Sequence, residues 1–138
     1  MSTASIDRSV QKTDTWIKEM AEELDTDDRQ YAQRALRGFL HALRDRLPIN
    51  EAAQLAAQMP DVLRGIYYES WVPSRTPEKY HDLESFFARI AHEAQLDDQA
   101  EAARVADAGA HVLRRHISPG EIEDVVAAMP APIAALLS

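Results

Sequence analysis

The chain carries one segment twice, with seventy residues between equivalent positions. Residues 15–68 align with 85–138 without a gap and are identical at 13 of 54 positions. Apolar positions recur as well, so that Trp16 is matched by Phe86. Such a repeat indicates one structural unit that is used twice and packed on its own copy. The identical pairs are Ala21/Ala91, Glu23/Glu93, Asp27/Asp97, Asp28/Asp98, Ala32/Ala102, Arg34/Arg104, His41/His111, Leu43/Leu113, Arg44/Arg114, Glu51/Glu121, Ala57/Ala127, Met59/Met129 and Pro60/Pro130.

The composition favours helices over strands. The 138 residues include only four glycines, while alanine, leucine, arginine and glutamate are abundant. The last four residue types are strong helix formers, whereas a sandwich or barrel needs many turn residues between short strands. We therefore expect an all-α fold, a compact helical bundle of two tandem four-helix repeats related by pseudo-two-fold symmetry.

The spacing of apolar residues predicts the helices and the domain boundaries. Helical periodicity begins at Trp16 and is clearest from Ala32 to Leu47, and Pro48 ends that second helix. Ser118 is typical of an N-cap, with Glu121 placed to close a capping box. Each half is small for independent stability, so we expect one domain. The prediction is a flexible N-terminal tail (1–12), then a single helical domain (13–138) with repeat one at 13–70, a connector at 71–84 and repeat two at 85–138.

Charge and cysteine content limit the classes of partner. The net charge is −8, and both halves of the chain are acidic, which opposes binding to nucleic acid or to an anionic membrane surface. No apolar run approaches the length of a membrane span. The absence of cysteine excludes disulfides and thiolate zinc sites and fits a reducing compartment. We expect a cytoplasmic protein with no nucleic-acid or membrane partner.

A stripe of basic residues is the strongest candidate for a binding site. It lies opposite the leucines of the second helix and recurs in part in the second repeat. One interpretation is a surface for an anion or an acidic partner; the other is ion pairing with the repeated glutamates, Glu23/Glu93 and Glu51/Glu121. The stripe comprises Arg34, Arg37, His41 and Arg44, repeated as Arg104, His111 and Arg114, with Asp107 in the place of Arg37.

Aromatic residues gather where the first repeat joins the connector. Tyr67, Tyr68 and Trp71 form either an exposed patch suited to peptide binding or a group packed over the repeats. Their burial decides between these two hypotheses.

No catalytic or metal-binding motif is recognisable. The chain lacks a nucleophile motif, a glycine-rich phosphate loop and paired histidines at ligand spacing. A site shared by His41 and His111, and a calcium loop at Asp25–Asp28, were the closest alternatives, and the latter lacks the required glycine and glutamate. We expect no enzyme activity, no metal and no cofactor.

Several segments resemble the DUF2267 family over residues 13–137. The resemblance implies an all-helical prokaryotic protein with two internal repeats, of unassigned activity and without catalytic residues to transfer. It is carried by Trp16-Ile17, Leu40-x2-Leu43-x3-Leu47, Glu51-Ala52-x2-Leu55-x-Ala57-Gln58-Met59-Pro60, Leu63-Arg64, Trp71-x-Pro73, Phe86-Phe87-x2-Ile90-Ala91, Val112-Leu113, Ile117-Ser118-x2-Glu121 and Val125-x-Ala127-x-Met129-Pro130.

Two functions remain open at this stage. The first is a non-catalytic interaction or scaffold module that binds a protein partner or itself, for example as a homodimer. The alternative is a regulatory protein that binds a small ligand or an anion through the Arg/His faces or the cleft between the repeats.

Overall fold

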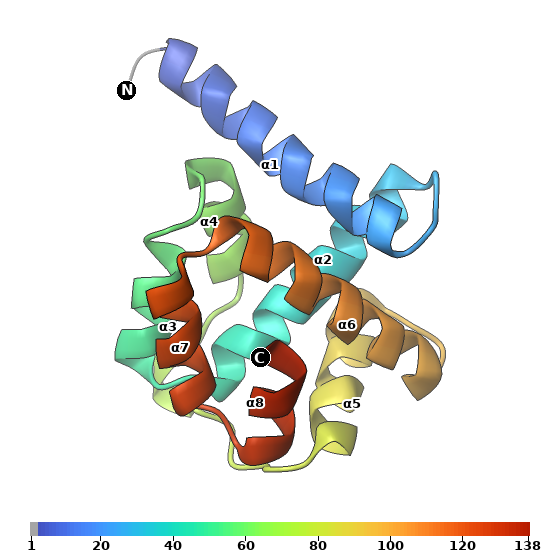
Figure 1. Cartoon of the computed structure of the whole chain (residues 1–138), viewed down its shortest axis with the longest axis vertical. Coiled ribbons are helices and arrows are strands. Elements are labelled where there is room, and N and C mark those ends of the chain that lie inside the picture. The colour runs from blue at the N-terminus through green and yellow to red at the C-terminus, as the bar shows by residue number, and fades with distance from the viewer. Residues whose placement is uncertain (1–2) are drawn as a thin grey trace.

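The computed structural model describes residues 3–138, which contain eight α-helices, one short 3-10 helix and no strand (Figure 1). This confirms the all-α class. The helices are α1 (Thr3–Glu23), α2 (Arg29–Arg46), α3 (Ile49–Ala56), α4 (Asp61–Tyr68), α5 (Leu83–Ala94), α6 (Gln99–His116), α7 (Pro119–Ala127) and α8 (Ala131–Leu137), with the 3-10 turn η1 (Pro73–Arg75) in the connector.

The helix boundaries follow the sequence repeat. Helix α6 begins and ends seventy residues after α2, and α8 begins seventy residues after α4. In both repeats a proline stands directly before the fourth helix, at Pro60 and Pro130. Proline is tolerated there because the first turn of a helix has no intrahelical partner for its N–H groups. The pseudo-two-fold symmetry itself stays a prediction.

Helix α1 is about ten residues longer than the apolar spacing indicates. It begins at Thr3, although we expected a flexible tail over 1–12; Met1 and Ser2 of that tail lie outside the described residues. Its buried stripe includes Ser9 and Thr13, and the Thr13 hydroxyl donates to the Ser9 carbonyl at 2.8 Å. Small polar residues therefore continue the helical face where apolar periodicity stops. The first half of α1 extends past α4 (Figure 1).

Side-chain caps begin most of the longer helices. The Asp28 and Asp98 carboxylates accept hydrogen bonds from the backbone N–H groups of Tyr31 and Glu101, at 3.0 and 2.7 Å. These caps satisfy donors that an α-helix leaves unpaired at its start.

Ser118 caps α7, but the predicted capping box does not form. The Ser118 hydroxyl accepts from the Glu121 N–H, whereas the Ser118 N–H donates to the Gln58 side chain at 2.8 Å. The prediction that the Glu121 carboxylate closes the box was wrong because Gln58, just after α3, supplies that acceptor.

The two halves pack on each other through their long helices. Helix α2 has its most extensive contact with α5, and α1 packs on α6 as well as α2. A Cβ atom placed on Gly38 would lie 2.6 Å from the Cβ of Ala94, so glycine permits the close approach of α2 and α5. Buried apolar residues from both repeats form one continuous cluster.

Within residues 3–138, no helix combines the length and the apolar character that crossing a bilayer requires.

Candidate functional site

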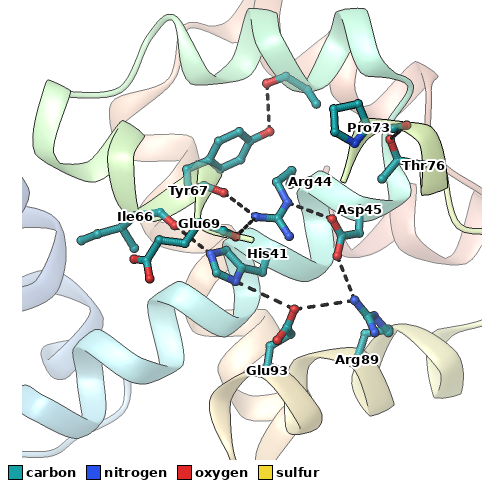
Figure 2. A network of polar contacts seen from close by, with 11 residues as sticks. His41, Arg44, Asp45, Ile66, Tyr67, Glu69, Pro73, Thr76, Arg89 and Glu93 are labelled. Carbon is teal, nitrogen blue, oxygen red and sulfur yellow. Dashed lines mark hydrogen bonds and ion pairs between the residues drawn. The ribbon is translucent and has the colours of Figure 1, made fainter. Parts of the chain in front are cut away.

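Arg44 lies in a buried network between α2, α4 and α5 (Figure 2). Its side chain is only 1% exposed. The Nη1 group donates to the carbonyl oxygens of Tyr67 and Glu69, at 2.8 and 2.7 Å, and Nε donates to the Asp45 carboxylate at 2.8 Å. The last carbonyls of a helix have no intrahelical donor. Arg44 therefore closes the end of α4 and is unavailable to a large external partner.

His41 lies one turn before Arg44 and acts on the same end of α4. Its Nε2 donates to the Ile66 carbonyl at 2.7 Å, and its Nδ1 is 3.9 Å from a Glu93 oxygen. Burial lowers the pKa of His41, and the neighbouring Arg44 charge acts in the same direction. A neutral ring is sufficient for this contact because a carbonyl needs only one N–H donor.

A chain of charges links α2 to α5 beside this histidine. Arg89 donates to the Asp45 carboxylate at 2.8 Å and lies 3.6 Å from Glu93 (Figure 2). The connector covers the group, because the Glu78 N–H donates to the Asp45 carbonyl at 2.8 Å. The polar cavity that remains there measures about 160 Å³. It has room for a few water molecules or a small ion, and not for a peptide.

Repeat two uses its equivalent arginine in the same way. Arg114 donates to the carbonyl of Leu137, the residue that corresponds to Tyr67, at 3.1 Å. Arginine at this position thus closes the fourth helix in both repeats. This structural duty explains why both copies have an arginine here.

The repeated histidines and glutamates meet crosswise between the repeats. Glu23 accepts from His111 at 2.8 Å, and Glu93 is the acid nearest His41. A neighbouring pair of contacts between the repeats has its charges exchanged. Arg89 of α5 meets Asp45 of α2, and at the equivalent positions Glu19 of α1 meets Arg115 of α6. The ion-pairing interpretation paired the repeated glutamates with the arginines of the stripe. Instead, Glu23 and Glu93 contact the stripe histidines and two arginines outside the stripe, Arg115 and Arg89.

The remaining basic residues of the stripe do not gather into one site. Arg34 donates to the Ala94 carbonyl at 2.7 Å, and Arg37 lies 3.8 Å from Glu69. Both border an open groove of about 410 Å³. Arg104 is exposed on α6 and does not border this groove. The seven predicted residues are therefore divided between helix ends, ion pairs and solvent.

The aromatic residues of the connector are largely packed. Tyr67 is fully buried, and its hydroxyl donates to the Ala52 carbonyl at 2.9 Å. Tyr68 and Trp71 are half-buried and stack on each other with ring centroids 5.1 Å apart. Tyr67 contributes no surface, so the three residues do not form an exposed patch together.

A groove runs along α1 and is lined by residues of both repeats. At its inner end, the Trp16 ring stacks on the His116 ring with centroids 4.6 Å apart. Two adjoining hollows of about 390 and 280 Å³ share Lys12, Met59 and Pro60. We call this feature the α1 groove. It is bordered by Arg8, Lys12 and Trp16 of α1, by Met59 and Pro60 between α3 and α4, and by His116 of α6.

The rim of the α1 groove is basic. The charged groups of Arg8 and Lys12 form no ion pair or hydrogen bond with any residue of 3–138. The nearby acids are already engaged: Asp61 pairs with Arg64 at 3.4 Å, and Glu19 contacts His116 and Arg115. Within residues 3–138, these two cations without a partner contrast with the net charge of −8.

Sequence reasoning did not find the α1 groove. Arg8 and Lys12 fall in the segment predicted to be a tail, and no binding role was predicted for His116. The one available signal was the Met59-Pro60 break, which recurs at Met129-Pro130 and forces a corner between two helices.

Three carboxylates also converge between α3 and α7. Glu51, Glu121 and Asp124 each place an oxygen atom within 4.8 Å of the others. In the described part of the chain, this is the group of side chains close enough together to hold a metal ion, and no histidine takes part.

Comparison with known sequences gives a family and no activity. No curated protein matches this sequence. The family described as "Uncharacterized conserved protein (DUF2267)" matches residues 13–136, which is nearly the whole chain. The chain therefore belongs to the DUF2267 family.

Proposed function

We propose that this protein is a non-catalytic interaction module whose α1 groove binds an acidic segment of a partner protein. The observation that carries the proposal is the pair of free cations, Arg8 and Lys12, beside an apolar floor in a protein of net charge −8. Complementary charge steers association and fixes the register of a bound partner.

The length of the groove favours a peptide segment over a small ligand. From Ser5 to Trp16, α1 rises about 16 Å, at about 1.5 Å per residue. An extended segment of about five residues, at about 3.3 Å each, covers this distance. A small ligand would occupy only one of the two hollows.

The floor of the groove favours one apolar anchor in that segment. The half-buried His116 ring stacks on Trp16, which is 2% exposed. Met59, 3% exposed, has a flexible thioether that can adapt as an apolar side chain inserts beside it. Buried apolar anchors surrounded by a polar rim carry most of the affinity in many interfaces. We therefore expect the bound segment to place an aromatic or aliphatic side chain between acidic residues.

Other occupants are outcomes of the same experiment. An acidic segment of a second copy would make the protein a homodimer. A small anion is the second candidate, favoured by the open groove beside Arg34 and Arg37, although Glu69 already pairs with Arg37 there.

The absence of cysteine agrees with a cytoplasmic location for such a module.

The test is binding of labelled acidic peptides, followed by fluorescence anisotropy. A panel of seven-residue peptides with one central Phe or Leu flanked by Asp and Glu is compared with uncharged versions. We expect Lys12→Glu and Arg8→Glu each to weaken binding about tenfold, equivalent to about 1.4 kcal/mol. The matched control is Lys18→Glu, on the same helix but outside the groove and exposed.

The control separates a specific groove from general attraction. Lys18→Glu is expected to change Kd by less than about twofold, and binding is expected to weaken with added salt. Equal losses in all three variants, or no loss in any, would contradict the proposal. A mass that depends on protein concentration, and falls in Lys12→Glu, would identify a second copy as the occupant.

A further inference from the structure

Glu51 and Glu121 occupy the same position in the two repeats, and they meet each other. Helices α3 and α7, which carry them, pack side by side (Figure 1). Asp124 lies one turn after Glu121, and the three carboxylates approach within 4.8 Å. Because the equivalent residues of the two repeats contact each other, two carboxylates of the same charge are brought together. This contact is unfavourable unless a proton or a cation lies between them.

The contact differs from a cluster of surface acids because Glu121 is buried. Glu121 is 7% exposed, and its side chain points at the other two acids. The Oε2 atoms of Glu51 and Glu121 are both shielded from solvent, and neither has a hydrogen-bond partner in the described part of the chain. A buried polar atom without a partner costs about 1–3 kcal/mol, and more when it is charged.

Among the described residues, no positively charged group acts on the Glu121 carboxylate. The groups that act electrostatically on the Glu121 carboxylate are Glu51 and Asp124, both acids. Tyr67 of α4 also faces the site, but its hydroxyl donates to the Ala52 carbonyl. The neighbouring Gln58 is likewise engaged with Ser118. An external cation or a proton is therefore the only means of neutralising the site.

We propose that Glu51, Glu121 and Asp124 bind a hard divalent cation between the two repeats. Carboxylate oxygens are the ligands that Ca²⁺, Mg²⁺ and Mn²⁺ prefer, at about 2.0–2.6 Å. Oxygens on opposite sides of such an ion lie about 4–5 Å apart by that geometry, which the separation of these three groups accommodates. Asp124 is exposed, so water completes the coordination on its side.

A proton competes with the cation for this site. Burial and the nearby Glu51 raise the pKa of Glu121 to about 8. A cation at this site therefore has to displace the proton that Glu121 retains at neutral pH. Its affinity is accordingly greater above pH 8 than near pH 6, and binding releases a proton.

The bound ion would join α3 of the first repeat to α7 of the second. In the unfolded chain the three carboxylates are far apart, so the ion binds only the folded protein. The melting temperature therefore increases with ion concentration. This effect depends only on the acidic site and not on the α1 groove. Failure of one proposal consequently leaves the other standing.

The experiment uses Mn²⁺ as the probe. Binding to the full chain is followed by electron paramagnetic resonance, and melting by circular dichroism, at pH 8.5 and pH 6.0. We expect one Mn²⁺ per chain at pH 8.5, a higher melting temperature, and affinity at least tenfold weaker at pH 6.0. Glu51→Gln is expected to abolish both effects, whereas Glu123→Gln, an exposed acid of α7, leaves them unchanged.

Each outcome decides the proposal. Melting without metal verifies that Glu51→Gln is folded, and Asp124→Asn provides a second variant that alters only the exposed ligand. Absence of Mn²⁺ binding up to about 5 mM at pH 8.5 would overturn the proposal in favour of the proton on Glu121 alone. Equal binding by wild type and Glu51→Gln would overturn it in favour of scattered surface acids.

Discussion

The aromatic ring of Phe39 lies on Gly109, the residue that occupies its own position in the second repeat. A Cβ atom on Gly109 would come within 2.5 Å of that ring. The two copies of one position therefore divide the space between α2 and α6 unequally. A glycine in the second repeat suggests a smaller second core, but the phenylalanine of the first repeat fills the gap.

The Phe39–Gly109 contact predicts the effect of adding one methyl group. Gly109→Ala is expected to lower the free energy of unfolding by about 1–3 kcal/mol, because the backbones have to move apart. Urea denaturation measures the loss. In the background of Phe39→Leu, which removes the obstructing ring, the same change is expected to cost clearly less. Additive losses in the double variant would show that the two positions are not coupled.

The two equivalent arginines are expected to differ in importance. Arg44 is 1% exposed and serves two carbonyls and Asp45, whereas Arg114 is half-buried and serves one carbonyl. Arg44→Met is expected to lower the free energy of unfolding by about 3 kcal/mol, because a buried carboxylate loses a partner. Arg114→Met should cost about 1 kcal/mol. Losses of equal size, measured by urea denaturation, would argue against the role in closing α4.

His41 gives the fold a specific sensitivity to acid. Its pKa in the folded protein lies below the ordinary value of about 6.5, so the unfolded chain takes up the proton first. Stability from this residue is present above about pH 6.5 and is lost as the pH falls further, by up to about 1.4 kcal/mol per pH unit. Comparison of wild type with His41→Gln between pH 7.5 and 5.0 isolates the effect. Identical pH profiles would rule it out.

Glu121 produces the opposite pH dependence when divalent ions are removed. Its pKa of about 8 in the folded protein exceeds the ordinary value of about 4.3, so the folded chain keeps a proton that the unfolded chain releases. Stability therefore falls as the pH rises from about 4.5 to 8. With a chelator present, Glu121→Gln should gain stability over wild type as the pH increases. A difference that is constant with pH would contradict this assignment.

The repeat made much of the fold predictable. Because Pro60 and Pro130 stand directly before α4 and α8, the starts of these two short helices could be predicted closely, whereas α3 already ends at Ala56. The length of α1 could not, because Ser9 and Thr13 continue its buried face without being apolar. The periodicity of hydrophobic residues cannot reveal a buried helical face that continues with small polar residues hydrogen-bonded within the helix.

The sites were less predictable than the helices. Spacing placed Arg34 and Arg44 on one helical face, but only the packing of α4 and α5 determines that both donate to carbonyls. The α1 groove depends on Trp16 and His116, which are a hundred residues apart and meet only through α1 and α6. Likewise, the contact of Glu51 with Glu121 required the arrangement of α3 beside α7.

The most direct test of the α1 groove is a titration followed by nuclear magnetic resonance. The indole N–H signals of the two tryptophans report on separate places, Trp16 in the groove and Trp71 in the connector. On addition of the acidic peptide that binds best, we expect the signals of Trp16, Lys12 and His116 to shift together while that of Trp71 stays. Shifts centred on Arg34 and Arg37, with Trp16 unchanged, would contradict the account and assign binding to the stripe on α2.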